Sequence, residues 1–260
     1  MEQVDAALDG SCRRPVVIGL CGAQGSGKTT LAGEVLEACR ARGLRCAGLS
    51  IDDIYLTRAA RQELARRVHP LFATRGVPGT HDVELGLSIV ASLERGEAAP
   101  LPRFDKGEDD RVPRISWPSA PAKCEVLLLE GWCVGARPQA DWALGEPVNE
   151  LERTEDADAT WRIYANAALA GAYARLFARF DRLVLLAAPD FSVVERWRAQ
   201  QEAELALRGG PHVLDAAAIG RFVSHYERLT CHILNEMPDR ADLVVQLDAE
   251  RRPLAITPRS

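Results

Sequence analysis

The chain has 260 residues, of which 47% are hydrophobic and 27% charged, and this composition of an ordinary globular protein argues against extensive disorder. Its formal net charge of −5 lacks the broad positive surface that binding to a nucleic-acid backbone requires. No apolar run approaches the roughly 18 residues of a membrane span, and the acidic first residues do not resemble a targeting segment. We therefore expect a cytoplasmic single-domain protein without nucleic-acid or membrane partners, in which residues 1–14 form a flexible N-terminal extension.

Short apolar runs alternate along the chain with segments of helical periodicity. The first run, from Pro15 to Cys21, predicts a buried strand, and the periodic segment from Lys28 to Arg42 predicts a helix that ends at Gly43. Further strands are predicted at residues 44–51, 126–129, 183–186 and 243–247, and further helices at residues 58–68, 82–95, 157–180, 191–207 and 215–236. Strands that are apolar on both faces and alternate with helices indicate an α/β fold with a five-stranded, mainly parallel sheet.

Neither pattern holds between Glu97 and Lys123, where five prolines surround the charged sequence RFDKGEDDR. A loop of this length within a compact domain is usually functional or mobile. The alternative is a solvated charged connector.

The sequence between the first strand and the first helix fits the phosphate-binding loop G-x-x-x-x-G-K-[ST]. It reads Gly22-Ala23-Gln24-Gly25-Ser26-Gly27-Lys28-Thr29 and is followed by Thr30. Glycines let successive backbone N–H groups face phosphate oxygens, and the helix N-terminus adds to the attraction. We expect residues 22–30 to bind ATP, with Lys28 on the β- and γ-phosphates and the Thr29 hydroxyl on Mg²⁺.

A phosphate-binding loop alone does not distinguish a kinase from a GTPase switch or a motor ATPase. The chain contains no N-K-x-D guanine-reading sequence and no L-S-G-G-Q. The strand expected to carry the acid on the Mg²⁺ side ends in VLLLEGW, with the single carboxylate Glu130 where a motor normally has Asp-Glu. The second acid that would prime a hydrolytic water is missing, which favours a kinase over a nucleotide-dependent switch or ATPase.

Asp52 and Asp53 follow the second predicted strand at its carboxyl end, which is the ligand side of a parallel sheet. A carboxylate at this edge can accept the proton of an attacking hydroxyl. Alternatively, the pair caps the next turn, and we expect one of the two to be a cap even where the other is catalytic.

Arg196 and Arg198 flank Trp197 just after the fourth predicted strand. Two cations at this position suit the neutralisation of transition-state charge in phosphoryl transfer. The alternative is an exposed cationic helix face with a buried Trp197.

Five segments of the chain resemble the plant-type D-glycerate 3-kinase family, with its bacterial and fungal relatives: SIDDIYL, RGVPGTHD, LPRFDKGEDDR, LLLEGWCVG and RWRAQQE. The resemblance runs from about Val16 to Leu247 and relates the chain to the phosphoribulokinase, uridine kinase and pantothenate kinase group. It implies a strand order of 2-3-1-4-5, counted along the chain. It also implies a catalytic base at Asp52, the acid on the Mg²⁺ side at Glu130, and a phosphate lid on the helix with Arg196 and Arg198.

The resemblance implies ATP-dependent phosphorylation of D-glycerate, and a kinase for a nucleoside or a pantothenate-like acid is the nearest alternative. Lys106 lies in the charged segment and is one of only three lysines in an arginine-rich chain, so it is a candidate donor for an anionic acceptor. The residues expected to bind the acceptor are Asp53, Tyr55, Arg75, His81, Asp82, Arg103, Lys106 and Arg111. Asp82 could equally cap a helix. Asn149 and the Trp161-Arg162 pair could either line the pocket or serve as a cap and core.

Overall fold

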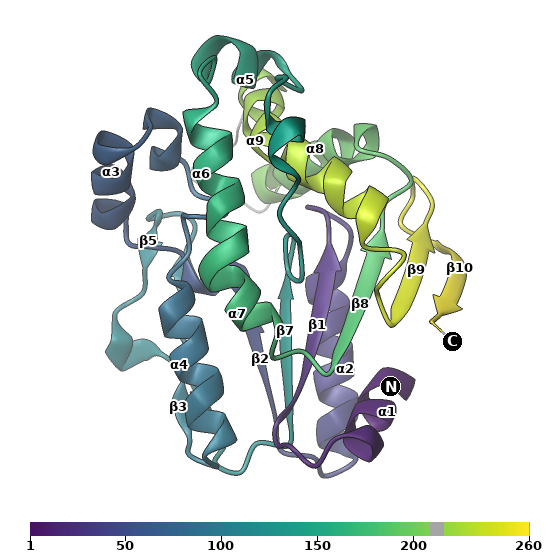
Figure 1. Cartoon of the computed structure of the whole chain (residues 1–260). Helices are drawn as coiled ribbons and strands as arrows, with labels where there is room; N and C mark the ends of the chain where they lie inside the picture. The colour runs from purple at the N-terminus through teal and green to yellow at the C-terminus, as the bar shows by residue number, and fades with distance from the viewer. Residues whose placement is uncertain (208–215, 260) are drawn as a thin grey trace.

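The computed structural model describes residues 1–207 and 216–259, so Asp215, where the last predicted helix begins, lies outside the described residues. The centre is a six-stranded sheet with helices on both faces (Figure 1). Its strand order is β10, β9, β8, β1, β7, β2; β10 is antiparallel to β9 and the other neighbouring strands are parallel. The strands are β1 (Val16–Gly22), β2 (Cys46–Ser50), β7 (Val126–Gly131), β8 (Arg182–Ala187), β9 (Leu243–Leu247) and β10 (Pro253–Pro258).

The five predicted strands are present in the predicted order, because β2-β7-β1-β8-β9 is the order 2-3-1-4-5. The predicted number of strands is wrong, since β10 adds a sixth at the open edge. Its sequence, PLAITP, begins and ends with proline, and every residue of the strand is exposed. Proline is tolerated at an edge because the outer side of the strand has no ladder to complete, so the usual strand signals are weak there.

Two helical layers cover the sheet. The helices are α1 (Glu2–Gly10), α2 (Lys28–Ala41), α3 (Arg58–Arg67), α4 (Val83–Glu94), α5 (Glu150–Glu155), α6 (Thr160–Ala168), α7 (Ala174–Phe177), α8 (Ser192–Leu207) and α9 (Ala216–Glu236). Alternate residues of the buried strands face α1 and α2 on one side and α4, α7 and α9 on the other (Figure 1). Among the described residues, no helix is long and apolar enough to cross a membrane.

The N-terminal residues do not form the flexible extension expected from the sequence. Residues 2–10 are helix α1, and its Val4 and Ala7 are each only 2% exposed because they pack against the sheet. Val4 and Ala7 are spaced as on one face of a helix, but the acidic residues around them make this pattern hard to recognise in the sequence.

The segment from 97 to 123 folds into two short antiparallel ladders. The outer ladder pairs β3 (Ala99–Pro100) with β6 (Ser119–Ala120), and the inner one pairs β4 (Phe104–Asp105) with β5 (Asp110–Arg111). We call residues 104–111 the charged hairpin. The helix predicted over residues 157–180 is interrupted, because α6 passes through a wider turn at Leu169–Tyr173 before α7.

Candidate active site

Three parallel strands end side by side and bring the predicted catalytic residues to one edge of the sheet. Cys21 of β1 is in register with Gly131 of β7, and Glu130 of β7 is in register with Ser50 of β2. The phosphate-binding loop, Glu130 and Asp52 therefore emerge next to one another, as expected for the ligand side of a parallel sheet.

The phosphate-binding loop is tightly wound between β1 and α2. Gly25 and Gly27 have φ angles of 77° and 86°, a left-handed backbone that other residues rarely adopt. A Cβ on Gly25 would also lie 2.7 Å from the Cβ of Trp197 in α8. Lys28 begins α2, with Thr29 and Thr30 on the same first turn.

The predicted metal ligands lie together, since the Thr29 hydroxyl donates to Glu130 Oε1 at 3.2 Å. Glu130 is only 6% exposed. Within the described part of the chain, Glu130 Oε2, Ser26 Oγ and Gln24 Oε1 are buried without a hydrogen-bond partner. Buried oxygens without partners are costly, and hard oxygen ligands suit Mg²⁺, so the residues present fit a magnesium–phosphate group.

Asp52 lies in the short 3₁₀ turn Ile51–Ile54 that follows β2. Its Oδ1 accepts a hydrogen bond from the Tyr55 hydroxyl at 2.9 Å, and its Oδ2 lies 2.7 Å from Lys106 Nζ. Burial opposes ionisation of this carboxyl, but Lys106 and Lys28 outweigh it and hold the pKa of Asp52 well below its usual range. The group is ionised at neutral pH and ion-paired to Lys106.

Asp53 has a different environment from its neighbour. It pairs with Arg103 at 3.1 Å and accepts a hydrogen bond from the backbone N–H of Phe104 at 3.2 Å. Burial raises the pKa of Asp53 above its usual value. The expectation that one of the two aspartates is a cap is wrong, because Ser50 caps the turn by accepting from the Asp52 N–H. Asp53 instead anchors the charged hairpin.

The RGVPGTHD segment lies against the turn Ile51–Ile54, which we call the acidic turn. Tyr55 and His81 form an antiparallel bridge, and their rings stack with centroids 4.4 Å apart. His81 Nδ1 lies 2.6 Å from the Tyr173 hydroxyl, and burial lowers the pKa of His81 to about 3. His81 is therefore neutral at pH 7 and offers no positive charge to an acceptor.

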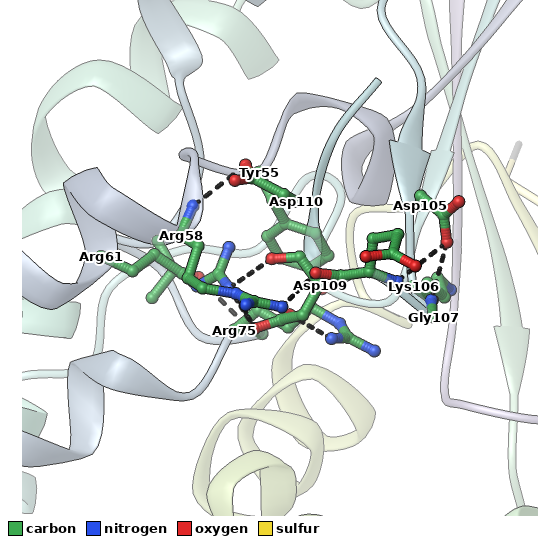
Figure 2. A network of polar contacts seen from close by, with 12 residues as sticks. Tyr55, Arg58, Arg61, Arg75, Asp105, Lys106, Gly107, Asp109 and Asp110 are labelled. Atoms are coloured by element: carbon green, nitrogen blue, oxygen red, sulfur yellow. Dashed lines mark hydrogen bonds and ion pairs between the residues drawn. The ribbon is translucent and has the colours of Figure 1, made fainter. Parts of the chain in front are cut away.

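The candidate arginines pair with acidic residues in and around the charged hairpin, and Figure 2 shows Arg75 beside Asp109. Arg111 donates to the Tyr55 carbonyl at 2.7 Å and to Asp82 at 3.2 Å, while Arg75 pairs with Asp109. Asp82 also caps α4 by accepting from the Leu85 N–H at 3.1 Å, so capping and pairing coexist in one side chain.

The two arginines of α8 differ in burial. Arg196 is exposed, Trp197 between them is fully buried, and Arg198 lies over the Phe222 ring of α9 at 5.0 Å. Their role at transition-state phosphates stays a prediction.

The sequence analysis did not single out two arginines near the site, Arg61 and Arg251. Arg61 of α3 is fully buried and pairs with Asp109 at 2.5 Å. Arg251, in the turn between β9 and β10, donates to the Gly25 carbonyl at 2.5 Å and lies over the Trp197 ring. The Arg61 position on the buried face of α3 is a weak signal in the sequence, whereas nothing marks Arg251.

Residues 149–162 could either line the pocket or serve as cap and core, and the structure shows cap and core. Asn149 caps α5, Trp161 packs in a hydrophobic cluster, and Arg162 forms a buried ion pair with Asp156. These residues are cap and core.

Comparison with known proteins places this geometry in a family. No protein-family model matches the chain. A kinase of Schizosaccharomyces pombe, described as uncharacterized, is 32% identical over 94% of this chain and 91% of its own length. The chloroplastic D-glycerate 3-kinase of Arabidopsis thaliana is 28% identical over 95% of this chain. The structure of D-glycerate 3-kinase from Cryptococcus neoformans superposes with a TM-score of 0.81 and 26% identity, covering 99% of this chain and 96% of that one.

The chain belongs to the D-glycerate 3-kinase family of P-loop kinases. It spans 55% of the length of the plant enzyme. This family member is an ATP-dependent phosphotransferase with an alcohol group as acceptor, which confirms the kinase predicted from the single acid of β7.

Proposed function

We propose that this kinase transfers the γ-phosphate of ATP, with Mg²⁺, to a hydroxyl group of D-glycerate in the cytoplasm. The observation that carries the proposal is the pairing of Asp52 with Lys106 at 2.7 Å. A carboxylate that can accept a hydroxyl proton thus lies beside a cation that can bind an acceptor carboxylate. The names of the plant and Cryptococcus relatives support this choice of acceptor.

Each part of the site has a task in this reaction. The loop amides of residues 22–27 and Lys28 bind the β- and γ-phosphates, and Thr29 and Glu130 would hold Mg²⁺, which neutralises charge that develops on the phosphates. The acceptor hydroxyl oxygen attacks the γ-phosphorus while Asp52 takes its proton. The bond from the γ-phosphorus to the bridging oxygen breaks, and ADP leaves. Arg196 and Arg198 are proposed to neutralise the transferring group.

The acceptor is proposed to lie between the acidic turn and the charged hairpin. Its carboxylate is matched by Lys106, whose side chain is 61% exposed and therefore accessible to a ligand. Arg75, Arg103 and Arg111 are held by Asp109, Asp53 and Asp82, so they shape the wall of the site rather than approach the ligand freely.

A panel of acceptors tests the proposal through the rate of ADP release. We expect kcat/KM for D-glycerate to exceed that for glycerol by at least about 10³-fold, because glycerol has no carboxylate to bind Lys106. Uridine and pantothenate should be poor acceptors. A comparable value for glycerol, or a preference for uridine or pantothenate, would reject D-glycerate and leave the kinase assignment standing. Lys28→Ala should abolish transfer to every acceptor without lowering Tm.

A further inference from the structure

Lys106 contacts the carboxylate that is proposed to act as the base. Its Nζ lies 2.7 Å from Asp52 Oδ2, and Lys28 is the second cation that acts on the same group. A carboxylate held in an ion pair is a weak proton acceptor, because protonation abolishes the attraction to its partner. In this arrangement, Asp52 is ionised but poorly suited to take a proton.

The backbone that carries Lys106 is fixed (Figure 2). Arg61, itself fully buried, holds Asp109 at 2.5 Å, and Arg103 holds Asp53 at 3.1 Å. At the tip of the hairpin, the Gly107 N–H donates to Asp105 Oδ1 at 2.8 Å. The charged hairpin is therefore held from outside through Asp109 in its turn and through Arg103 next to β4, and its tip is braced by an internal hydrogen bond.

The Lys106 side chain, in contrast, is suited to change partners. It is 61% exposed, and the side chain of Asp52 is 28% exposed, so water and ligands reach the pair. A lysine carries a compact charge on a flexible four-carbon stem, whereas the neighbouring arginines make several directed hydrogen bonds. Nζ can move by several ångströms without any change in the hairpin backbone.

We propose that Lys106 is a latch on Asp52 that the acceptor itself releases. The acceptor carboxylate takes over the Lys106 ammonium, ATP phosphates take over Lys28, and of its partners within residues 1–207 and 216–259 the Asp52 carboxylate then keeps the Tyr55 hydroxyl. This proposal rests on the proposed function, because it requires an anionic acceptor. Asp52 thus becomes an effective base only when both substrates are bound.

The latch suppresses a specific side reaction. In that reaction a water oxygen attacks the γ-phosphorus, the bond to the bridging oxygen of ADP breaks, and the water gives its proton to Asp52, so that the products are ADP and phosphate. While Lys106 holds Asp52, this carboxylate accepts a proton from water poorly. Lys106 therefore contributes to the choice of acceptor over water as well as to acceptor binding.

The test is the rate of ADP release by Lys106→Met without any acceptor. A positioned base contributes about 10²–10⁴-fold, so partial release of Asp52 should raise hydrolysis about tenfold over the unsubstituted enzyme. Lys106→Arg keeps the charge and should keep hydrolysis low. Glu108→Gln, an exposed change on the same turn, is the matched control and should leave hydrolysis unchanged. For Lys106→Met, KM for D-glycerate should also rise and the preference for D-glycerate over glycerol should narrow.

Unchanged or slower hydrolysis by Lys106→Met, with Tm intact, would overturn the latch. If Lys106→Met lowers Tm, the hydrolysis rate of Lys106→Gln replaces it, and the same outcomes decide. The hydrolysis assay contains no D-glycerate, so the two proposals fail separately. An enzyme that does not phosphorylate D-glycerate rejects the proposed function. An enzyme that phosphorylates D-glycerate while Lys106→Met hydrolyses ATP no faster rejects the latch alone.

Discussion

At the scale of single residues, the adjacent aspartates Asp52 and Asp53 differ in their contacts and therefore in their expected roles. Asp52 lies among the Tyr55 hydroxyl, Lys106 and Lys28, and these hold it ionised at the ligand side of the sheet. Asp53 points to Arg103 and the Phe104 N–H, and burial raises its pKa. Neighbouring residues in a tight turn point in different directions, so identical side chains one position apart meet different partners.

Substitution of each aspartate by asparagine separates these tasks. Asp52→Asn removes the proton acceptor, and we expect kcat to fall about 10²–10⁴-fold, or about 3–5 kcal/mol of barrier, with little change in ATP affinity. Asp53→Asn weakens a charge-assisted contact to the hairpin, so we expect a loss of about 1–2 kcal/mol in stability and a higher KM for the acceptor. Steady-state kinetics of both variants measure kcat and KM, and thermal unfolding measures the change in stability. The reverse assignment of the two effects would show that Asp53 is the base.

At the scale of elements, the turn between β9 and β10 joins the phosphate-binding loop to α8. Arg251 donates to the Gly25 carbonyl and to the Gln200 side chain at 2.8 Å, and its guanidinium lies 5.2 Å from the Trp197 ring centroid. Trp197 in turn donates to the Ala249 carbonyl at 2.8 Å. Two elements far apart in sequence, α8 and the β9–β10 turn, thus meet at Gly25 of the phosphate-binding loop.

Removal of the contact between Arg251 and Gly25 should weaken binding of the nucleotide rather than of the acceptor. For Arg251→Gln we expect KM for ATP to rise about tenfold, equivalent to about 1.4 kcal/mol, because Gly25 loses a charged hydrogen-bond donor. KM for the acceptor should change little. Arg252→Gln is the control, since its side chain is exposed on the same turn. An equal rise in both KM values would instead indicate general loosening of the site.

At the scale of the whole molecule, the sequence predicted what depends on local pattern. The runs of β1 and β7 are apolar at nearly every position because both faces of these strands are buried, and the glycines of residues 22–27 mark the loop between strand and helix. The strand order came from the family resemblance and is confirmed. The contact between Lys106 and Asp52 could not be predicted, because the two residues are 54 positions apart and meet only when the charged hairpin folds.

The same reason limits what the sequence says about the other residues expected to bind the acceptor. The arginines of the RGVPGTHD and RFDKGEDDR segments are expected to bind the acceptor; Arg75 and Arg111 also have acidic partners in the surrounding turns, and their contact with the acceptor stays a prediction. Sequence composition counts the charges of a segment but does not show which of them neutralise one another. The mistakes at the two ends have a related cause, since α1 is stabilised by packing on the sheet and β10 by pairing with the strand β9.

The edge position of β10 leads to a prediction about the whole molecule. All of its residues are exposed, so its removal forfeits little buried apolar surface, but it pairs with β9 along most of its length. Deletion of residues 253–260 would leave the unpaired backbone of β9, whose sequence LVVQL is free of charge and apolar except for Gln246, at the edge of the sheet. We expect the shortened chain to keep a folded core and to aggregate with increasing concentration, as measured by light scattering and size-exclusion chromatography.

A matched variant separates edge pairing from surface hydrophobicity. Leu254 and Ile256 of β10 are 69% and 62% exposed, and the double change Leu254→Thr, Ile256→Thr keeps the strand while it removes exposed apolar surface. Threonine favours strands, so β9 should stay covered and the double variant should aggregate no more than the full chain. Aggregation of the double variant to the same extent as the deletion would show that these two side chains, rather than the backbone pairing of β10, keep the molecule from associating. A deletion variant that elutes and scatters like the full chain at all concentrations would contradict the protective role of β10, because an uncovered parallel strand with this sequence should recruit further chains.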